Sequence, residues 1–137
     1  MKNTKFKKLA LISFSLFILI FIILTFFFLS KSYKNYQLGE RAIKQGNIDL
    51  AISYYDYSIR NYTLFNKYSQ LSANRLRKIA EDFENKAEYK KATAIYQTLL
   101  SALSSIETGY SKNKKEIEFL IEKVQQLRAK IPENEFL

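Results

Sequence analysis

The feature that most constrains this chain is an uncharged apolar stretch near its N-terminus, which runs from Leu9 to Leu29. As an α-helix, these 21 residues would extend roughly 32 Å, enough to cross the ~30 Å hydrocarbon core of a bilayer. Four lysines crowd the eight residues before it. The sequence therefore predicts a basic head at residues 1–8 and a transmembrane helix at residues 9–30.

Two alternatives to a transmembrane anchor are a buried soluble helix and a cleaved signal peptide. Few soluble helices are apolar on every face over such a length. Ser30 and Ser32 offer small side chains at a plausible cleavage spacing, but the apolar stretch exceeds the ~7–15 residues of a signal-peptide core. No cysteine follows it, which excludes lipoprotein processing. We expect the helix to be retained.

Lysine placement predicts the orientation. Lys31, Lys34, Arg41 and Lys44 are spread over the fourteen residues after the stretch, so basic residues are denser before it. The positive-inside rule then favours a cytoplasmic N-terminus and an exported C-terminal domain. The Phe-, Ile-, Lys- and Asn-rich composition suggests a bacterial source. We expect a single-pass inner-membrane protein with a periplasmic or otherwise extracytoplasmic domain.

Composition excludes several kinds of chemistry. Without cysteine or histidine, the chain has no thiol nucleophile, imidazole base or zinc finger. Three glycines and one proline argue against a turn-rich β fold and a glycine-rich phosphate loop. The carboxylates near Glu81 and Glu118 alternate with Lys and Arg at helical spacing, which is typical of a solvated face. We expect an all-helical protein that is not an enzyme and binds no cofactor or metal.

Residues 31–137 contain one pattern twice, at an offset of 41 residues. The first copy reads Leu38-Gly39-x-x-Ala42, Gly46, Ala51-x-x-x-Tyr55, and the second reads Ile79-Ala80-x-x-Phe83, Ala87, Ala92-x-x-x-Tyr96. Small side chains let two antiparallel helix backbones approach closely, and Gly46-Asn47 favours a turn between them. The pattern predicts a duplicated helix–turn–helix. Because no Pro-rich or Gly/Ser-rich linker precedes the first copy, we expect the membrane helix to run almost directly into it.

This pattern resembles the tetratricopeptide repeat, which pairs Leu-Gly-x-x-Tyr on one helix with Ala-x-x-x-Phe on the next. The resemblance implies stacked helix pairs within a domain at 31–131, with units at about 32–63 and 64–106; a generic helical hairpin is the alternative. The family's early Trp falls on Asn35 and Leu76, and its closing Pro on Thr63 and Ser104. The period is also longer than the usual 34 residues, which predicts one lengthened helix over 64–83, or two with a bend.

The same 41-residue step predicts a third helix near the C-terminus. Its apolar positions are Ile117, Leu120, Ile121, Val124, Leu127 and Ile131. We expect an amphipathic helix at 113–131 that caps the last exposed apolar face, followed by a tail at 132–137. Ile121 stands where the pattern has a small residue, which is acceptable if no further helix packs there. A short coiled-coil seam along the same stripe is the alternative.

Tetratricopeptide arrays bind peptides or helices along the surface lined by each unit's first helix, and this resemblance implies the partner-binding candidates. They are Tyr36, Glu40, Ile43 and Lys44 from the first unit, and Asn74, Arg77, Glu81, Glu84 and Asn85 from the second. Tyr54 and Tyr57 are candidates for an outer contact, because their spacing predicts a shared face that points away from the core.

These features predict a membrane-anchored protein–protein interaction scaffold, a component of a bacterial envelope complex with an unidentified protein partner. The alternative is a structural homo-oligomer assembled through the repeats and the C-terminal amphipathic helix. Residues 31–137 carry 18 basic and 13 acidic side chains, and the cations are distributed along the sequence rather than gathered into a patch. We therefore expect no nucleic acid among the partners.

Overall fold

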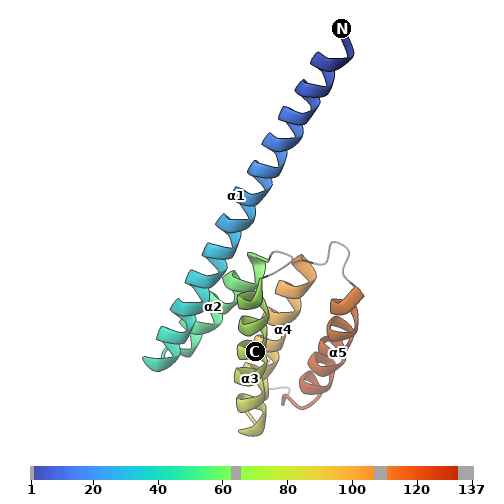
Figure 1. The fold of residues 1–137 in the computed structure, drawn as a ribbon. Coiled ribbons are helices and arrows are strands. Elements are labelled where there is room, and N and C mark those ends of the chain that lie inside the picture. The colour runs from blue at the N-terminus through green and yellow to red at the C-terminus, as the bar shows by residue number, and fades with distance from the viewer. Residues whose placement is uncertain (1, 63–65, 107–110, 133–137) are drawn as a thin grey trace.

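The computed structural model describes residues 2–62, 66–106 and 111–132, and this part of the chain is helical throughout (Figure 1). The five helices are α1 (Lys2–Lys44), α2 (Ile48–Arg60), α3 (Lys67–Asn85), α4 (Tyr89–Ser105) and α5 (Ser111–Arg128). No strand occurs within those three ranges. The prediction of an all-α fold is confirmed.

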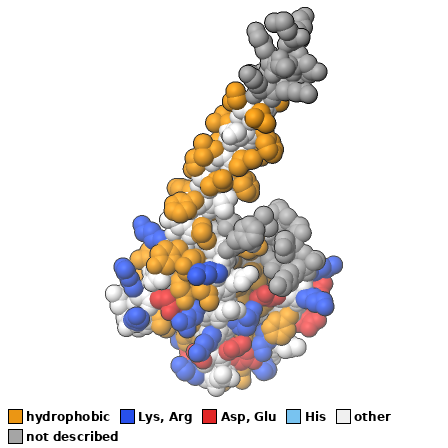
Figure 2. Space-filling model, viewed as in Figure 1, with side chains coloured by type: hydrophobic (Ala, Val, Ile, Leu, Met, Phe, Trp, Pro, Cys, Tyr) orange, Lys and Arg blue, Asp and Glu red, His pale blue; other side chains and the backbone are white. Residues whose placement is uncertain are grey.

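Helix α1 joins the apolar stretch to the bundle without a break. The large apolar side chains from Leu11 to Phe28 are each at least 40% exposed, whereas Ser32 is fully buried. The N-terminal part therefore projects from the bundle as a rod with apolar side chains on its visible face (Figures 1 and 2). It is long and apolar enough to cross a membrane. The expected direct run into the first helix of the domain is confirmed.

The C-terminal part of α1 packs closely against α2. A Cβ atom at Gly39 would lie only 2.5 Å from Cε1 of Tyr55, so the helices approach at a distance that only glycine permits. Tyr55 itself is fully buried. The turn between the helices uses Gly46 at a φ of +73°, and Asn47 caps α2 by accepting a hydrogen bond from the Leu50 amide. The small residue and the turn glycine therefore act as the pattern predicts.

Helices α3 and α4 form a second pair whose turn repeats the bonding of the first. The Asn47 amide donates to the Ala42 carbonyl at 2.9 Å, and the Glu88 amide donates to Phe83 at the same distance. Ala87 occupies the position of Gly46 and adopts a φ of +59°. The segment expected as one long helix or two bent ones contains the single helix α3, which begins at Lys67; Leu64 and Phe65 lie outside the described residues.

Helix α5 covers the far side of α4 with the apolar stripe seen in the sequence. Ile117, Leu120, Val124 and Leu127 are each at most 8% exposed, while Ile121 is 42% exposed. The structure begins this helix at Ser111 and ends it at Arg128, so Ile131 is buried just beyond the helix rather than within it. The stripe proposed for a coiled-coil seam is therefore occupied by contacts inside the chain.

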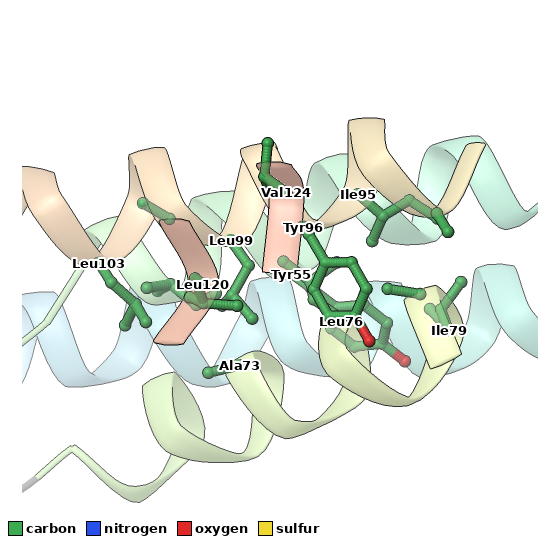
Figure 3. Packing of buried hydrophobic residues seen from close by; sticks show 14 of the residues in the cluster. Tyr55, Ala73, Leu76, Ile79, Ile95, Tyr96, Leu99, Leu103, Leu120 and Val124 are labelled. Atoms are coloured by element: carbon green, nitrogen blue, oxygen red, sulfur yellow. The ribbon is translucent and has the colours of Figure 1, made fainter. Parts of the chain in front are cut away.

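One continuous core runs through the bundle. Each helix packs against the next along the chain, and α1 also contacts α3 while α2 contacts α4. Tyr55, Leu76, Tyr96, Leu99 and Leu120 meet in its centre (Figure 3). The contacts of α1 with α3, and the ion pairs that join α3 to α5, place α1, α3 and α5 in succession along the bundle.

Candidate functional site

Ion pairs link α1 to α3 and α3 to α5. Arg75 Nη2 lies 2.7 Å from the Glu40 carboxylate, and Lys123 Nζ lies 2.8 Å from the Glu84 carboxylate. Arg77 also pairs with Glu116. These contacts bring side chains from three helices, far apart in sequence, onto one surface of the bundle. That surface is the one on which the sequence predicts partner binding.

Glu40 is the most constrained carboxylate of this surface. It accepts a 2.6 Å hydrogen bond from the Tyr55 hydroxyl and two further bonds from Arg75. Burial alone would raise the pKa of Glu40, but the bonds from Tyr55 and Arg75 and the charges of Arg75 and Lys44 outweigh it and lower the pKa. Burial and the same Glu40 contact raise the pKa of Tyr55, so the phenol stays protonated as a donor.

The corresponding tyrosine of the second pair has a weaker partner. The Tyr96 hydroxyl lies 3.5 Å from Glu84, at the limit of a hydrogen bond. Burial and the nearby charge of Glu84 raise the pKa of Tyr96 to about 12. Both buried phenols therefore serve as neutral donors that hold helices together, and neither is poised for proton transfer near neutral pH.

A groove of about 320 Å³ opens between α1, α2 and α3, and we call it the distal groove. It is lined by Ile43, Ile48, Arg75, Lys78, Ile79, Asp82, Phe83 and Lys86. The three isoleucines and Phe83 provide apolar surface, and the remaining four side chains supply three positive charges and one negative charge. The α1–α2 turn beside it lies at the end of the bundle away from the projecting rod (Figure 1).

Phe83 also lines two further hollows, an open one of about 500 Å³ beside the α1–α2 turn and one of about 240 Å³ between α2 and α4. The Lys86 and Lys91 ammonium groups lie 5.8 Å and 5.2 Å from its ring centroid. Cations at this distance are attracted to the face of an aromatic ring. The half-buried ring of Phe83 is therefore an apolar surface bordered by positive charge on both sides.

The predicted site residues of α1 have three different environments. Tyr36 is half-buried, with its ring 6.2 Å from that of Tyr55 and 5.8 Å from that of Tyr68. Glu40 is engaged by Tyr55 and Arg75 as described, and Lys44 is exposed. Of the four α1 candidates, only Ile43 lines the distal groove.

The predicted residues of α3 lie on the side that faces α5. Arg77 donates to the Asn74 side chain at 3.0 Å and also pairs with Glu116 of α5, and Glu81 is exposed. The distal groove instead uses the neighbouring stripe of α3, which includes Arg75, Lys78 and Lys86. Projection from the repeat pattern did not identify that stripe, because a one-residue change in register turns a helix by about 100°.

The two tyrosines predicted to point outward from α2 differ in burial. Tyr57 is 58% exposed, whereas Tyr54 is partly buried and packs against the core. The expectation of a shared outward face therefore fits Tyr57 and is wrong for Tyr54. The physical reason is helix geometry: Tyr54 lies three residues after Ala51 and four before Ser58, both fully buried, so it borders the face that α2 turns to the core.

Among the described residues, no group of three or more Asp or Glu side chains is arranged to hold a metal ion. The surface thus offers apolar contact, fixed charges and tyrosine rings. Comparison with models of known protein families gives no match, and comparisons with curated proteins and with solved structures give none either.

Proposed function

We propose that this chain is a single-pass, membrane-anchored interaction scaffold without enzymatic activity, and that its bundle is a tetratricopeptide-like array. In this proposal the N-terminus is cytoplasmic, the bundle lies outside the cytoplasm, and the partner is another protein of a bacterial envelope complex. The distal groove is the proposed binding site. The observation that carries the proposal is this groove, an apolar floor with a mainly basic rim on a bundle attached to an apolar rod.

The exposure of the rod supports the anchor. A run of large apolar side chains that are each at least 40% exposed, interrupted only by Ser13, Ser15 and Thr25, is unfavourable in water. A bilayer removes that exposure, and an uncharged helix satisfies its backbone hydrogen bonds internally. The lysines before and after the run are consistent with its two ends lying at the membrane surfaces.

The arrangement of the helices supports the repeat assignment. Two turns with the same backbone hydrogen bonds recur at the 41-residue offset of the sequence pattern. Gly39, Ala51, Ala80 and Ala92 are all buried at the contacts between helices. Contacts between next-nearest helices, α1 with α3 and α2 with α4, are those expected of stacked helix pairs.

The composition of the distal groove indicates the chemistry of the partner. Ile43, Ile79 and Phe83 can accept an apolar side chain, while Lys78 and Lys86 stand at the rim. Positive groups beside an apolar floor favour a peptide or helix that carries acidic residues next to an apolar one. We expect Phe83 to make the largest contribution, because aromatic side chains dominate binding energy at such contacts.

Site-specific photocrosslinking in native membranes tests this function. A benzophenone amino acid at Lys78 or Lys86 should crosslink to a protein other than this chain, and Phe83→Ala should abolish that adduct. The matched control places the same probe at Ser53, an exposed position on α2 that does not line the groove. Equal crosslinking from Ser53, or adducts that persist in Phe83→Ala, would remove the groove as the binding site.

The alternative, a structural homo-oligomer, is favoured by the outer face of α5. Phe119 and Ile121 are 51% and 42% exposed there, on the helix that ends the stack. A second copy could extend the array by packing on this face. In that case a probe at Phe119 would give a crosslink at the mass of two chains, and the groove positions would give none.

A further inference from the structure

The end of the bundle nearest the rod is assembled from four helix termini. Ser32 Oγ donates to the Ser58 carbonyl, and Ser58 Oγ donates to the Ser32 carbonyl, both at 2.9 Å. Arg60 Nη2 donates to Ser101 Oγ at 3.1 Å. These bonds place Ser32, the last turn of α2 and Ser101 of α4 at a similar height along the bundle axis, which we call one level. The ends of α2 and α4, and the starts of α3 and α5, therefore lie on the rod side of that level (Figure 1).

This end, which we call the rod-side end, has a one-sided charge. Its exposed cations are Lys31, Lys34, Lys67, Lys114 and Lys115. Within the described part of the chain, none of these five forms an ion pair with an acidic side chain. Arg60 is neutralised by Asp56 at 2.9 Å. Residues 31–39, 57–62, 66–74 and 97–106 contain no Asp or Glu, whereas the first two turns of α5 contain Glu116, which pairs with Arg77, and the exposed Glu118; Glu107 lies outside the described residues.

The opposite end of the bundle carries both signs. Its acidic side chains are Asp49, Glu81, Asp82, Glu84 and Glu88, and its basic ones are Arg41, Lys44, Lys78, Lys86, Lys90, Lys91, Arg128 and Lys130. Several of these side chains are joined in ion pairs, as for Glu84 with Lys123 and Glu88 with Lys91. The two ends therefore differ in how their cations are placed: most described acidic side chains lie toward the opposite end, whereas the exposed lysines of the rod-side end form no ion pair with one.

Aromatic rings accompany the lysines at this end. Tyr33 is 46% exposed, and its ring lies 4.8 Å from that of Tyr68. Lys67 Nζ lies 5.2 Å from the Tyr68 centroid, and Lys31 Nζ lies 4.4 Å from that of Phe27 in the rod. Tyrosine and lysine with this arrangement are typical of the boundary between bilayer and water.

We propose that the rod-side end binds the headgroups of anionic phospholipids and thereby docks the bundle on the membrane. This inference rests on the proposed anchoring, because the continuous helix α1 carries the end to the bilayer surface only if residues 9–30 span it. Lys31 follows the apolar stretch by two residues, so no spacer separates the five lysines from the phosphate layer. Each lysine near such a surface contributes about fivefold to binding, equivalent to ~1 kcal/mol.

Fluorescence quenching of the reconstituted full chain tests the docking. The chain contains no cysteine, so Ser104→Cys provides a unique labelling site on the last turn of α4, and Asn85→Cys provides one at the opposite end. Vesicles of phosphatidylcholine with a nitroxide headgroup label are prepared with or without phosphatidylglycerol. We expect a fluorophore at 104 to be quenched strongly only with phosphatidylglycerol and to recover at high salt. A fluorophore at 85 should remain unquenched.

Charge-neutral variants identify the residues. Lys67→Gln, Lys114→Gln and Lys115→Gln together should lower the docked-to-undocked ratio on the order of 100-fold. Arg41→Gln, Arg128→Gln and Lys130→Gln remove the same charge from the other end and should leave quenching unchanged. Equal effects of the two triple variants would overturn the inference, as would quenching at 104 that does not depend on lipid charge. Circular dichroism verifies helicity, and Lys114→Gln with a salt titration replaces the triple variant if it unfolds.

Extraction separates this inference from the anchoring on which it depends. If alkaline carbonate releases the chain from the vesicles, the transmembrane anchor is wrong. If the chain is retained but the fluorophore at 104 is equally accessible in both lipid mixtures, the anchor stands and the docking is wrong. Binding of the rod-side end to an acidic protein instead of lipid would give this second outcome.

Discussion

The two helix pairs of this bundle have the same turns and small-residue contacts, but they stabilise their interiors differently. In α1–α2, the buried hydroxyls of Ser32 and Ser58 satisfy one another, and Tyr55 donates to Glu40 at 2.6 Å. At the positions equivalent to Ser32 and Ser58, the second pair has Ala73 and Leu99. Of its own buried hydroxyls, Ser69 donates to the Ile59 carbonyl at 3.2 Å, whereas Ser72 and Thr93 have no hydrogen-bond partner among the described residues.

This difference shows how one pattern tolerates two kinds of interior. The first pair continues into the rod, and its specific polar bonds fix the direction in which α1 leaves the bundle. The second pair is enclosed by α2 and α5, and its apolar contacts require less directional bonding. Five sets of substitutions test this contrast, taken from the largest expected effect to the smallest.

The close approach at Gly39 should be the most sensitive point of the first pair. Gly39→Leu forces side-chain atoms into the space occupied by the Tyr55 ring, and we expect a loss of about 3 kcal/mol in the free energy of unfolding. Urea unfolding in detergent measures it. Ala80→Gly, at the equivalent position of the second pair, should cost only about 1 kcal/mol through helix propensity. Similar losses for both variants would contradict a tighter approach in the first pair.

The hydroxyl groups of the two buried tyrosines should contribute differently to the stability of the bundle. Tyr55→Phe removes a donor to a charged carboxylate and should cost about 2 kcal/mol. Tyr96→Phe removes a bond at the 3.5 Å limit and should cost about 0.5 kcal/mol or less. Thermal unfolding of the two variants side by side measures the difference, and a larger loss for Tyr96→Phe would reverse the assignment.

Glu40 also gives the first pair a dependence on pH. Its pKa is lower in the folded than in the unfolded chain, so its stabilising contribution is present above the unfolded pKa and disappears as pH falls through the folded value. The loss should therefore appear below about pH 4. Glu40→Gln should flatten this part of the profile, measured by urea unfolding across the acidic range. An unchanged slope in that variant would exclude Glu40 as its origin.

Removal of a buried hydroxyl should change stability in opposite directions in the two helix pairs. Ser58→Ala leaves Ser32 with fewer partners and should cost about 1.5 kcal/mol. Thr93→Val keeps the side-chain shape while removing an unpaired hydroxyl, and it should raise stability by about 1 kcal/mol. Melting temperatures compared with the unsubstituted chain measure both. Destabilisation by Thr93→Val would indicate that its hydroxyl has a partner, such as water.

Substitutions in the two turns should have the smallest effects on the free energy of unfolding, with opposite signs. Gly46→Ala places a side chain in the left-handed region and should cost about 1 kcal/mol, whereas Ala87→Gly should raise stability by about 0.5 kcal/mol. Equilibrium unfolding of the two variants measures both signs. Effects of the same sign would mean that the turns are not conformationally equivalent.

Much of the fold could be predicted because its signals are local and periodic. The uncharged stretch from Leu9 predicts a helix. Gly46 and Ala87 mark the two turns, and the apolar stripe through Leu120 predicts a buried helix face. The helix ends were less predictable: α5 begins at Ser111 and Ile131 is buried outside it, since end residues depend on caps and neighbours. Tyr54 was assigned to the wrong environment because it borders the buried face of α2, beside Ala51 and Ser58.

The site was less predictable than the fold. Repeat projection identified Ile43 but not Arg75, Lys78 or Phe83 as lining the distal groove. It also predicted Arg77 and Glu81, which lie on the correct helix, α3, but on a different face from the residues that line the groove. Rotation of a helix about its axis is set by packing on both neighbours, and the contact between α3 and α5 has no signature within either segment.

The sequence alone determined that this chain is helical, that its N-terminal segment can span a bilayer, and that its helices pack in pairs, because period, length and side-chain size act along the chain. Only the tertiary structure decided which charges meet. Lys67 and Lys114 lie in the first turns of α3 and α5, and antiparallel helices return these turns to the end of the bundle at which α1 carries Lys31. The electrostatic potential at a surface depends on which side chains are neighbours in space. Cations that are evenly distributed in the sequence therefore meet at one end without acidic partners.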